Sequence, residues 1–432
     1  MQLSIQIVYK LNETIFSSGF VARHRNKGTD FTRKRSLPLP HLISFMLNMV
    51  NSSIQTELHK FFQVVDDKLI SSSVVTASAF CRARRKFSYS AFKELNSDLV
   101  DTFYKSPLVK RWNGFRLLAV DGSITNLPDN QEVDDYFGRA RATSVRPSAR
   151  LSQLFDVLNK ISIDVEVSPV SVGERKQATA HLDHAKKDDL VLYDRGYPAV
   201  WLFIRHQQQG VNFCCRTPVD YSNQVNDFVK SKAKDKVVSF PCTEKSLKHC
   251  RKYGLPTQPI SVRLVKVKLE NGDTEVLMTS LFDKKKYPRK VFENLYHQRW
   301  FIEEDYKLMK SRLEMENFSG KSVEAVKQDI HAKALTKNIA AVAIAEADVF
   351  AQERCKKRKL KYKINFSYAL SLLKDNIIRF TLGLISADVQ RLLIDRISKV
   401  VHAIRPGRGF VRENKGVMRK RRKRHSMAYK RV

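Results

Sequence analysis

The sequence Phe115-Arg-Leu-Leu-Ala-Val120, directly followed by Asp121, decides the fold class. A short apolar run that ends at an acidic residue is typical of a buried strand. A second run of this kind, Leu190-Val-Leu-Tyr193, ends at Asp194. In α/β sheets, ligands bind at the carboxyl ends of strands, so the two aspartates are candidates for one polar site, half of a metal site.

Similar patterns on either side of these two runs predict the rest of the sheet and its helices. Further strands are expected at 150–158, 161–170, 260–269 and 275–282. Asn271-Gly272, between the last two, is a strong signal for a hairpin turn. Helices are expected at 174–187, 288–316 and 323–350, the last with a buried Ala-rich stretch at 339–345. Strands interspersed with helices predict a mixed α/β fold.

The first 110 residues are predicted to be helical instead. Apolar residues after Pro40 recur at helical spacing, and Thr76 is a candidate N-cap for a second helix. That helix carries Arg82, Arg84 and Arg85 toward its end. It resembles a helix presented to DNA, or a surface helix whose cations complement its dipole, and spacing alone does not separate these two interpretations.

The composition indicates a globular protein with a polyanionic partner. The chain has 432 residues, 78 Lys and Arg against 44 Asp and Glu, and a net charge of +34. Its hydrophobic content of 43% excludes a merely disordered basic chain. Residues 405–432 contain twelve Lys or Arg and a single acid, so a disordered tail that contacts phosphates is expected; a solubilising tail or a localisation signal are the alternatives.

Neither a disulfide framework nor a membrane segment is expected. The six cysteines form no Cys-x-x-Cys pair, so reduced structural thiols are predicted. The beginning of the sequence has no secretory-signal pattern, and no window reaches the roughly 18 apolar residues that span a bilayer.

The helix expected after residue 288 carries a stripe of chemically versatile side chains. Its members, with spacings of 3, 4 and 7, are Tyr296, Arg299, Glu303 and Lys310. At about 100° per residue these positions share one helix face. A carboxylate among cations suits a ligand of a hard divalent ion beside groups that hold phosphate.

Ordinary structural roles compete with each of these assignments. An aspartate after a strand is often only a turn or cap residue. Glu303 could instead form a surface pair with Lys307, and the neighbouring Glu304 and Asp305 compete with it as ligands. His181 and His184 flank an acid but are expected to be surface residues.

The stripe has the pattern Y-x2-R-x3-E-x6-K, which resembles the signature of DDE transposases of the bacterial insertion-sequence-four family. Two other segments, Val120-Asp-Gly-Ser123 and Tyr193-Asp-Arg-Gly-Tyr197, resemble the segments around that family's first and second catalytic aspartates. The order of the three segments also fits. The resemblance covers about residues 40–410.

This resemblance implies an RNase H-like mixed sheet flanked by helices. Asp121 would lie on the first strand, Asp194 on the fourth and Glu303 on a later helix. The expected divisions are a helical N-terminal DNA-binding region at 1–110, the catalytic core at 111–210 and 284–350, a β-rich insertion at 211–283, a helical C-terminal region at 351–404 and the basic tail at 405–432.

The resemblance also implies two-metal phosphoryl transfer at the element's ends, followed by strand transfer into target DNA. Asp121, Asp194 and Glu303 would hold two Mg²⁺ ions, with Mn²⁺ as a substitute. The expected contacts to DNA phosphates are Tyr296, Arg299, Lys310, Arg82, Arg84 and Arg85. The N-terminal region would bind the terminal inverted repeats. A homodimer in a synaptic complex, located with the nucleoid in the bacterial cytoplasm and not at a membrane, completes the expectation.

Some relatives hold a flipped base with a tryptophan of the insertion. Here the tryptophans are Trp112, Trp201 and Trp300, and none of them lies within 211–283. Phe228, Phe240 or Tyr253 would have to stack on the base instead. Formation of a DNA hairpin at the excised end is therefore left open. Two rival functions are a divalent-ion nuclease without strand transfer and a non-catalytic DNA-binding relic of a transposase.

Overall fold

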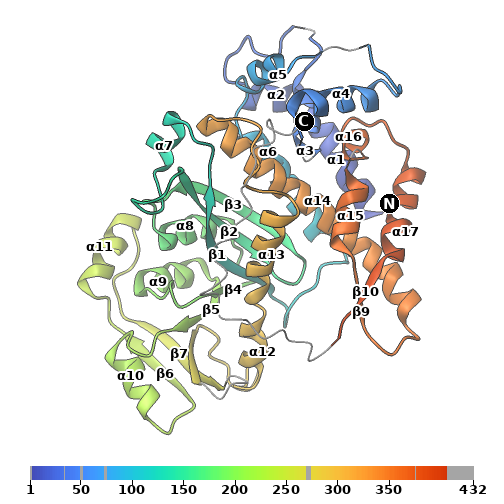
Figure 1. Cartoon of the computed structure of the whole chain (residues 1–432). Helices are drawn as coiled ribbons and strands as arrows, with labels where there is room; N and C mark the ends of the chain where they lie inside the picture. Colours follow the sequence, from blue (N-terminus) through green and yellow to red (C-terminus); the bar gives the residue numbers. More distant parts are fainter. Residues whose placement is uncertain are drawn as a thin grey trace. The chain divides into compact units, whose positions relative to one another are not determined.

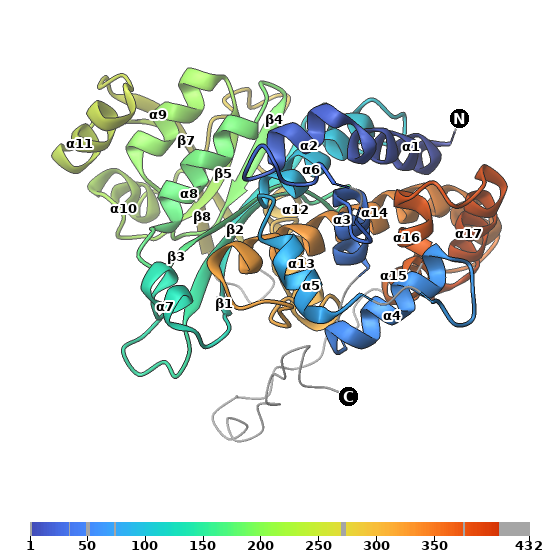
Figure 2. The same cartoon turned by 90° about the horizontal axis from the view of Figure 1, so that it is seen from above.

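The structure is a computed structural model that describes residues 2–33, 35–48, 52–72, 75–268, 274–374 and 376–405. The chain forms two compact units (Figures 1 and 2). The sheet unit comprises Lys110–Ile124 and Ala149–Lys307. The helical unit comprises Met1–Val109, Thr125–Ser148 and Leu308–Val432.

The main sheet has the order β3-β2-β1-β4-β5-β8-β7-β6 among the described residues. β1 is parallel to β4 and β4 to β5, whereas the pairs β2–β3, β5–β8, β7–β8 and β6–β7 are antiparallel. The predicted mixed sheet is therefore confirmed. The strands are β1 (Arg116–Asn126), β2 (Ser148–Asp156), β3 (Ile161–Pro169), β4 (Asp189–Tyr193), β5 (Asn212–Thr217), β6 (Asp235–Phe240), β7 (Ile260–Lys268) and β8 (Thr274–Thr279).

Strand β1 is longer than the apolar run that predicted it. β1 is buried from Leu117 to Val120 and becomes half-buried at Asp121, where its parallel pairing with β4 also ends, but the strand continues to Asn126. Asp121 thus marks the end of burial and not the end of the strand. The hairpin signal Asn271-Gly272 lies outside the described residues, although β7 and β8 pair as the hairpin requires.

Helices flank this sheet, and Figures 1 and 2 show α8 and α9 on one side and α13 on the other. Instead of one helix over 174–187, α8 is followed by a short 3₁₀ turn at Leu182–His184. The helices are α8 (Glu174–His181), α9 (Val200–Gln209), α10 (Asn223–Lys230), α11 (Glu244–Tyr253), α12 (Val291–His297) and α13 (Trp300–Ser311), whose last residues belong to the helical unit.

The single helix expected at 288–316 is wrong, because α12 and α13 are separated at Gln298 and Arg299. There the N–H of Arg299 bonds to the carbonyl of Tyr296 at 3.0 Å, and that of Ile302 to the carbonyl of Arg299 at 3.2 Å. These three-residue steps are tighter than α-helical ones. Neither Gly nor Pro marks the break in the sequence.

The helical unit is organised around α14 (Val323–Cys355), which packs against α1, α3, α6, α15 and α17. The prediction that its Ala-rich stretch is buried is confirmed for Ile339–Ala343. The other elements are α1 (Leu3–Phe16), α2 (Ser18–His24), α3 (Leu39–Leu47), α4 (Ile54–Val65), α5 (Ala77–Arg84), α6 (Ser90–Tyr104), α7 (Gln131–Phe137), β9 (Tyr362–Ile364), α15 (Phe366–Leu373), α16 (Asn376–Thr381), α17 (Ala387–Lys399) and β10 (Val401–Ala403).

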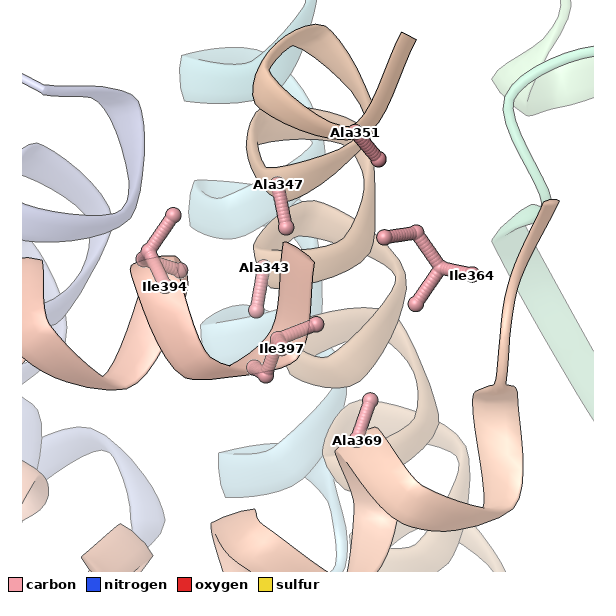
Figure 3. Packing of buried hydrophobic residues seen from close by; sticks show 7 residues of the cluster. All are labelled: Ala343, Ala347, Ala351, Ile364, Ala369, Ile394 and Ile397. Atoms are coloured by element: carbon pink, nitrogen blue, oxygen red, sulfur yellow. The ribbon is translucent and has the colours of Figure 1, made fainter. Parts of the chain in front are cut away.

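Small residues let neighbouring elements approach the end of α14 closely. Figure 3 shows Ala343, Ala347 and Ala351 along one side of α14, facing Ile394 and Ile397 of α17, Ile364 of β9 and Ala369 of α15. All seven side chains are buried. A methyl group on the helix leaves space for the larger isoleucines, which is how this cluster reaches core packing density.

Two further expectations concern the basic tail and membrane-spanning segments. Residues 406–432 of the basic tail lie outside the described residues. Within the described part of the chain, no helix is both long enough and apolar enough to cross a bilayer.

Candidate active site

Asp121 and Asp194 lie next to each other because β1 and β4 run parallel in register. Their paired register ends one residue before each aspartate. Asp121 Oδ1 accepts a hydrogen bond from the N–H of Gly122 at 2.8 Å, and Asp194 Oδ1 accepts one from the N–H of Gly196 at 2.7 Å. The main chain thus orients both carboxylates at the same edge of the sheet.

Helix α13 is tied to the strand that carries Asp121. The Tyr306 hydroxyl donates to the carbonyl of Asp121 at 2.9 Å, and the side-chain amide of Gln153, on β2, donates to the Asp305 carboxylate at 3.0 Å. Glu303 precedes Tyr306 by three residues on the same helix. These two contacts bring Glu303 to the side of the sheet where the aspartates lie.

The three consecutive acids of α13 have different partners. Asp305 is buried and bonded to the sheet. Glu304 accepts from the Trp300 indole at 3.1 Å and from Lys307 at 2.5 Å. Lys307 therefore pairs with Glu304 and not with Glu303, which removes the surface-pair alternative for Glu303.

The stripe of four residues is assembled differently from the prediction. Tyr296 lies near the end of α12, Arg299 lies in the turn between α12 and α13, and Glu303 and Lys310 lie on α13. Arg299 Nη2 nevertheless donates to Glu303 Oε1 at 2.6 Å, and its guanidinium carbon lies 5.8 Å from the centre of the Tyr296 ring. Lys310 lies about two turns farther along α13, and burial lowers its pKa.

The pKa of Asp121 shows that these groups form one electrostatic site. Burial is the largest cause that raises this pKa, from 3.8 to about 6. The Gly122 N–H and Arg299 lower it, whereas the negative charges of Glu303 and Asp194 raise it further. Three carboxylates therefore repel one another across this edge, and a cation would relieve that repulsion.

The donor chemistry of this edge fits a hard divalent ion, which prefers carboxylate oxygens. In the part of the chain that the structure describes, no three Asp, Glu, His or Cys side chains are grouped closely enough to hold an ion as they stand. Arg299 occupies the Glu303 carboxylate. Binding an ion would require Glu303 to exchange this partner.

The expectation that His181 is a surface residue is wrong. His181 is fully buried, its Nδ1 lies 2.8 Å from Asp164 Oδ2, and its Nε2 lies 2.9 Å from Ser152 Oγ. The Ser152 hydroxyl also donates to the carbonyl of Asp121 at 3.3 Å. His181 therefore belongs to a buried polar network beneath the Asp121 strand, whereas the His184 side chain is 47% exposed.

The aromatic residues considered for base stacking are mostly enclosed. Phe228 and Phe240 are buried. Trp201, on α9, stacks on His249 and Tyr253 of α11 with ring centres 4.6 and 5.6 Å apart. A tryptophan from outside 211–283 thus packs on the helix within that range, beside a cavity of about 580 Å³.

The three arginines of α5, in the helical unit, do not share one environment. Arg82 and Arg85 are exposed. Arg84 is buried and donates to Ser319 at 2.8 Å, to Asp329 at 2.9 Å and to Gln328 at 3.0 Å. Arg84 is therefore a structural residue, and its expected contact with DNA phosphate is withdrawn.

A cleft of about 840 Å³ beside α5 brings together basic residues that the sequence prediction missed. Its lining includes Arg82 with Arg33, Arg35 and Lys86. Lys86 is 3.9 Å from Asp30, whereas the other three are exposed. The dense basic run around residue 34 was the available signal, but only the fold shows that it faces α5.

Comparisons with known proteins agree with this geometry. A family model for the transposase DDE domain matches residues 112–339, more than half of the chain. The transposase InsG of insertion sequence element IS4 from Escherichia coli K12 is 23% identical over 318 residues, which are 72% of this chain and 71% of that protein. The putative transposase InsZ of the same organism is 24% identical over 42% of this chain and 61% of its own length.

Among solved structures, the chain is similar to a piggyBac transposase in a synaptic complex with hairpin DNA. The TM-score is 0.47 at 10% identity, over 93% of this chain and 86% of that one. The matched family range contains both aspartates and all of Tyr296, Arg299, Glu303 and Lys310. The chain therefore belongs to the IS4 family of DDE transposases, enzymes that transpose DNA and generally use divalent metal ions.

Proposed function

We propose that Asp121, Asp194 and Glu303 are the catalytic carboxylates and that they hold two Mg²⁺ ions, for which Mn²⁺ substitutes. The observation that carries this proposal is geometric: the β1–β4 register ends one residue before each aspartate, and Tyr306 ties the helix of Glu303 to the carbonyl of Asp121. Bound ions would activate the attacking oxygen and stabilise the leaving oxygen of an in-line displacement at phosphorus.

Arg299 is proposed to alternate between two anions. Without DNA it neutralises Glu303 at a distance of 2.6 Å. Its planar fork of donors matches phosphate oxygens equally well, so the phosphate of an entering DNA end competes for it. Movement of Arg299 to that phosphate would release Glu303 at the moment when the substrate is present.

Tyr296 and Lys310 complete the proposed grip on the DNA end. Burial raises the pKa of Tyr296 far above the neutral range, so its hydroxyl stays protonated and can donate to a phosphate oxygen. Burial lowers the pKa of Lys310, because a charged ammonium is less stable in a desolvated position. A phosphate beside Lys310 would stabilise the charged form.

The proposed reaction has two displacements at phosphorus. Water first attacks the phosphodiester at the element's end, and one P–O bond forms as another breaks to leave a 3′-hydroxyl. That hydroxyl then attacks a phosphodiester of the target DNA: a new P–O bond joins the element to its new site while the target's own P–O bond breaks and leaves a 3′-hydroxyl on the target. In both steps the protein's part is to orient the phosphate and to place the attacking and leaving oxygens in line.

DNA binding away from the catalytic centre is assigned to the helical N-terminal region. Arg82 and Arg85 project from α5, and the cleft beside it adds Arg33 and Arg35. Such cations bind phosphates and release counterions, which fits a chain of net charge +34. We assign the terminal inverted repeats to this region and further phosphate contacts to the basic tail.

A homodimer is proposed as the working assembly, because two ends must be cut and joined in concert. Its place of action would be the nucleoid in the bacterial cytoplasm, where donor and target DNA are both available.

The test is divalent-ion-dependent cleavage of a plasmid that carries the gene's own flanking ends. Native protein is compared with Glu303→Gln, which removes the charge with little change of shape. Glu304→Gln is the matched control, since Glu304 is the adjacent residue and pairs with Lys307. Cleavage that only Glu303→Gln abolishes, with Mg²⁺ and with Mn²⁺, is the expected result.

Other outcomes assign the rival functions. Cleavage without joined products in the presence of target DNA would indicate a nuclease. End binding by all three proteins, with no cleavage under any divalent ion, would indicate a DNA-binding relic and overturn the proposal.

A further inference from the structure

A fourth carboxylate, Glu174, lies at the same edge of the sheet as Asp121 and Asp194. Glu174 is the first residue of α8, the helix that follows β3. A methyl group built on Gly122 would lie 3.4 Å from Glu174 Oε1. One built on Gly196 would lie 3.8 Å from Glu174 Oε2 and 4.0 Å from Asp194 Oδ1. Glu174 is thus adjacent to the residues that follow both aspartates.

Gly122 and Gly196 connect Glu174 to the two aspartates. Each follows a catalytic aspartate by one or two positions, and each donates its N–H to that aspartate. At Gly122 a side chain would be in contact with the Glu174 carboxylate. The same main-chain segments that orient the two aspartates therefore lie beside the Glu174 carboxylate.

The Tyr197 hydroxyl is an independent sign that something is bound here. Tyr197 is 2% exposed, and among the described residues its hydroxyl oxygen has no hydrogen-bond partner. Burial raises the pKa of Tyr197 well above its usual value, and Asp121, Glu174 and Asp194 raise it further. A buried hydroxyl without a partner is unfavourable unless a ligand or its water satisfies it.

A purely structural role for Glu174 is the competing explanation. Its carboxylate pairs with Arg150 at 2.5 Å, and an acid in the first turn of a helix complements the dipole. The Glu174 side chain is 41% exposed, however, and an ion pair open to water contributes little to stability. Such a carboxylate is accessible to an ion from solution.

We propose that Glu174 is a further carboxylate ligand of the divalent-ion site, beside the main chain of Gly122 and Gly196 that binds the aspartates. This inference rests on the proposed function, because it adds a ligand to the same site. Glu174 would exchange Arg150 for the ion, as Glu303 exchanges Arg299. The Tyr197 hydroxyl would then donate to a ligating carboxylate or to an ion-bound water.

The test is Mn²⁺ binding to the full chain by isothermal titration calorimetry, with no DNA and no turnover. Glu174→Gln is compared with Glu293→Gln, a matched control whose carboxylate is 42% exposed and pairs with Arg289. Loss of a ligand should weaken Mn²⁺ binding by at least about tenfold, the lower limit observed when even the partners of metal ligands are removed. Glu293→Gln should bind as the native chain does.

Asp194→Asn separates failure of this inference from failure of the proposed function. If Asp194→Asn loses Mn²⁺ binding and Glu174→Gln retains native affinity and stoichiometry, Glu174 is structural and the inference is overturned. If neither variant changes binding, the site itself is wrong. Thermal unfolding in chelator checks that each variant is folded, and a Glu174→Gln midpoint equal to that of Glu293→Gln assigns the loss to the ion.

Discussion

Two groups of charged side chains are treated oppositely by this fold. In the helical unit, Arg84 is buried against Asp329, and Ser319 donates its N–H to the same carboxylate at 2.7 Å. In the sheet unit, carboxylates face one another, the pKa of Asp121 is raised to about 6 and the Tyr197 hydroxyl has no described partner. A satisfied buried charge indicates structure, whereas accumulated charge of one sign marks a place that is completed by a ligand.

The largest expected effect is a loss of DNA cleavage, without a loss of stability, when a carboxylate of the sheet unit is removed. Asp121→Asn or Asp194→Asn should lower DNA cleavage by at least about a hundred- to a thousandfold, as the loss of one group that stabilises charge in a transition state does. Removing a repelled charge should not lower stability, so the unfolding midpoint without metal should stay the same or rise. A marked fall in that midpoint would show that these carboxylates are structural.

The second effect is a loss of stability when the buried ion pair of Arg84 and Asp329 is broken. Arg84→Ala should destabilise the protein by about 3–5 kcal/mol, because it leaves the Asp329 carboxylate buried without its partner. Urea unfolding measures the change. Arg85→Ala, at the neighbouring exposed position, should stay within about 0.5 kcal/mol of the native chain. Equal effects of the two substitutions would contradict the assignment of Arg84 to the core.

The third effect is a pH dependence of stability that Asp121 causes. The folded-state pKa of Asp121, about 6, lies above its ordinary value of 3.8. The folded protein therefore holds this proton more tightly, and the contribution of Asp121 to stability falls as the pH rises through that window. Asp121→Asn removes the fall, so its stability relative to native should increase by roughly 2–3 kcal/mol between pH 4 and 7.

Chemical unfolding at several pH values, in chelator, measures this difference. A constant difference between the two proteins across the window would mean that Asp121 has an ordinary pKa.

The smallest effect separates the exposed arginines of α5 from the buried one. Arg82→Ala and Arg85→Ala should each weaken binding to the element's ends and reduce the slope of log affinity against log salt by about 1. Fluorescence anisotropy over a range of salt concentrations measures the slope. An unchanged slope in both variants would place the inverted-repeat contacts elsewhere.

Much of the sheet follows from local patterns in the sequence. The apolar runs before Asp121 and Asp194 are buried strands because each is short, apolar and followed by polar residues. The family signature predicted Glu303 as a third member of this polar edge, and in the structure its charge raises the pKa of Asp121. The break at Arg299 was missed because neither Gly nor Pro marks it in the sequence.

The remaining errors have one physical origin: the residues concerned bind partners that are far away in the sequence. Arg84 and Arg85 are adjacent, yet Arg84 meets residues more than 230 positions later. His181 was expected at the surface because its partner Asp164 lies on a strand whose position depends on the whole sheet. Glu174 gave no signal, since an acid in a first helical turn is ordinary and only the close glycines reveal its neighbours.

The strands between Asp194 and Glu303 continue the catalytic sheet. β5 pairs with β4 on one side and with β8 on the other, and β7 and β6 follow in the same sheet. Shortening the chain by excising 218–283 would uncover the long edge of β5, with its apolar Phe213 and Cys214, as a template for pairing with other chains. A trimmed enzyme would thus aggregate before its chemistry could be assayed, so this segment can be probed by substitutions but not by deletion.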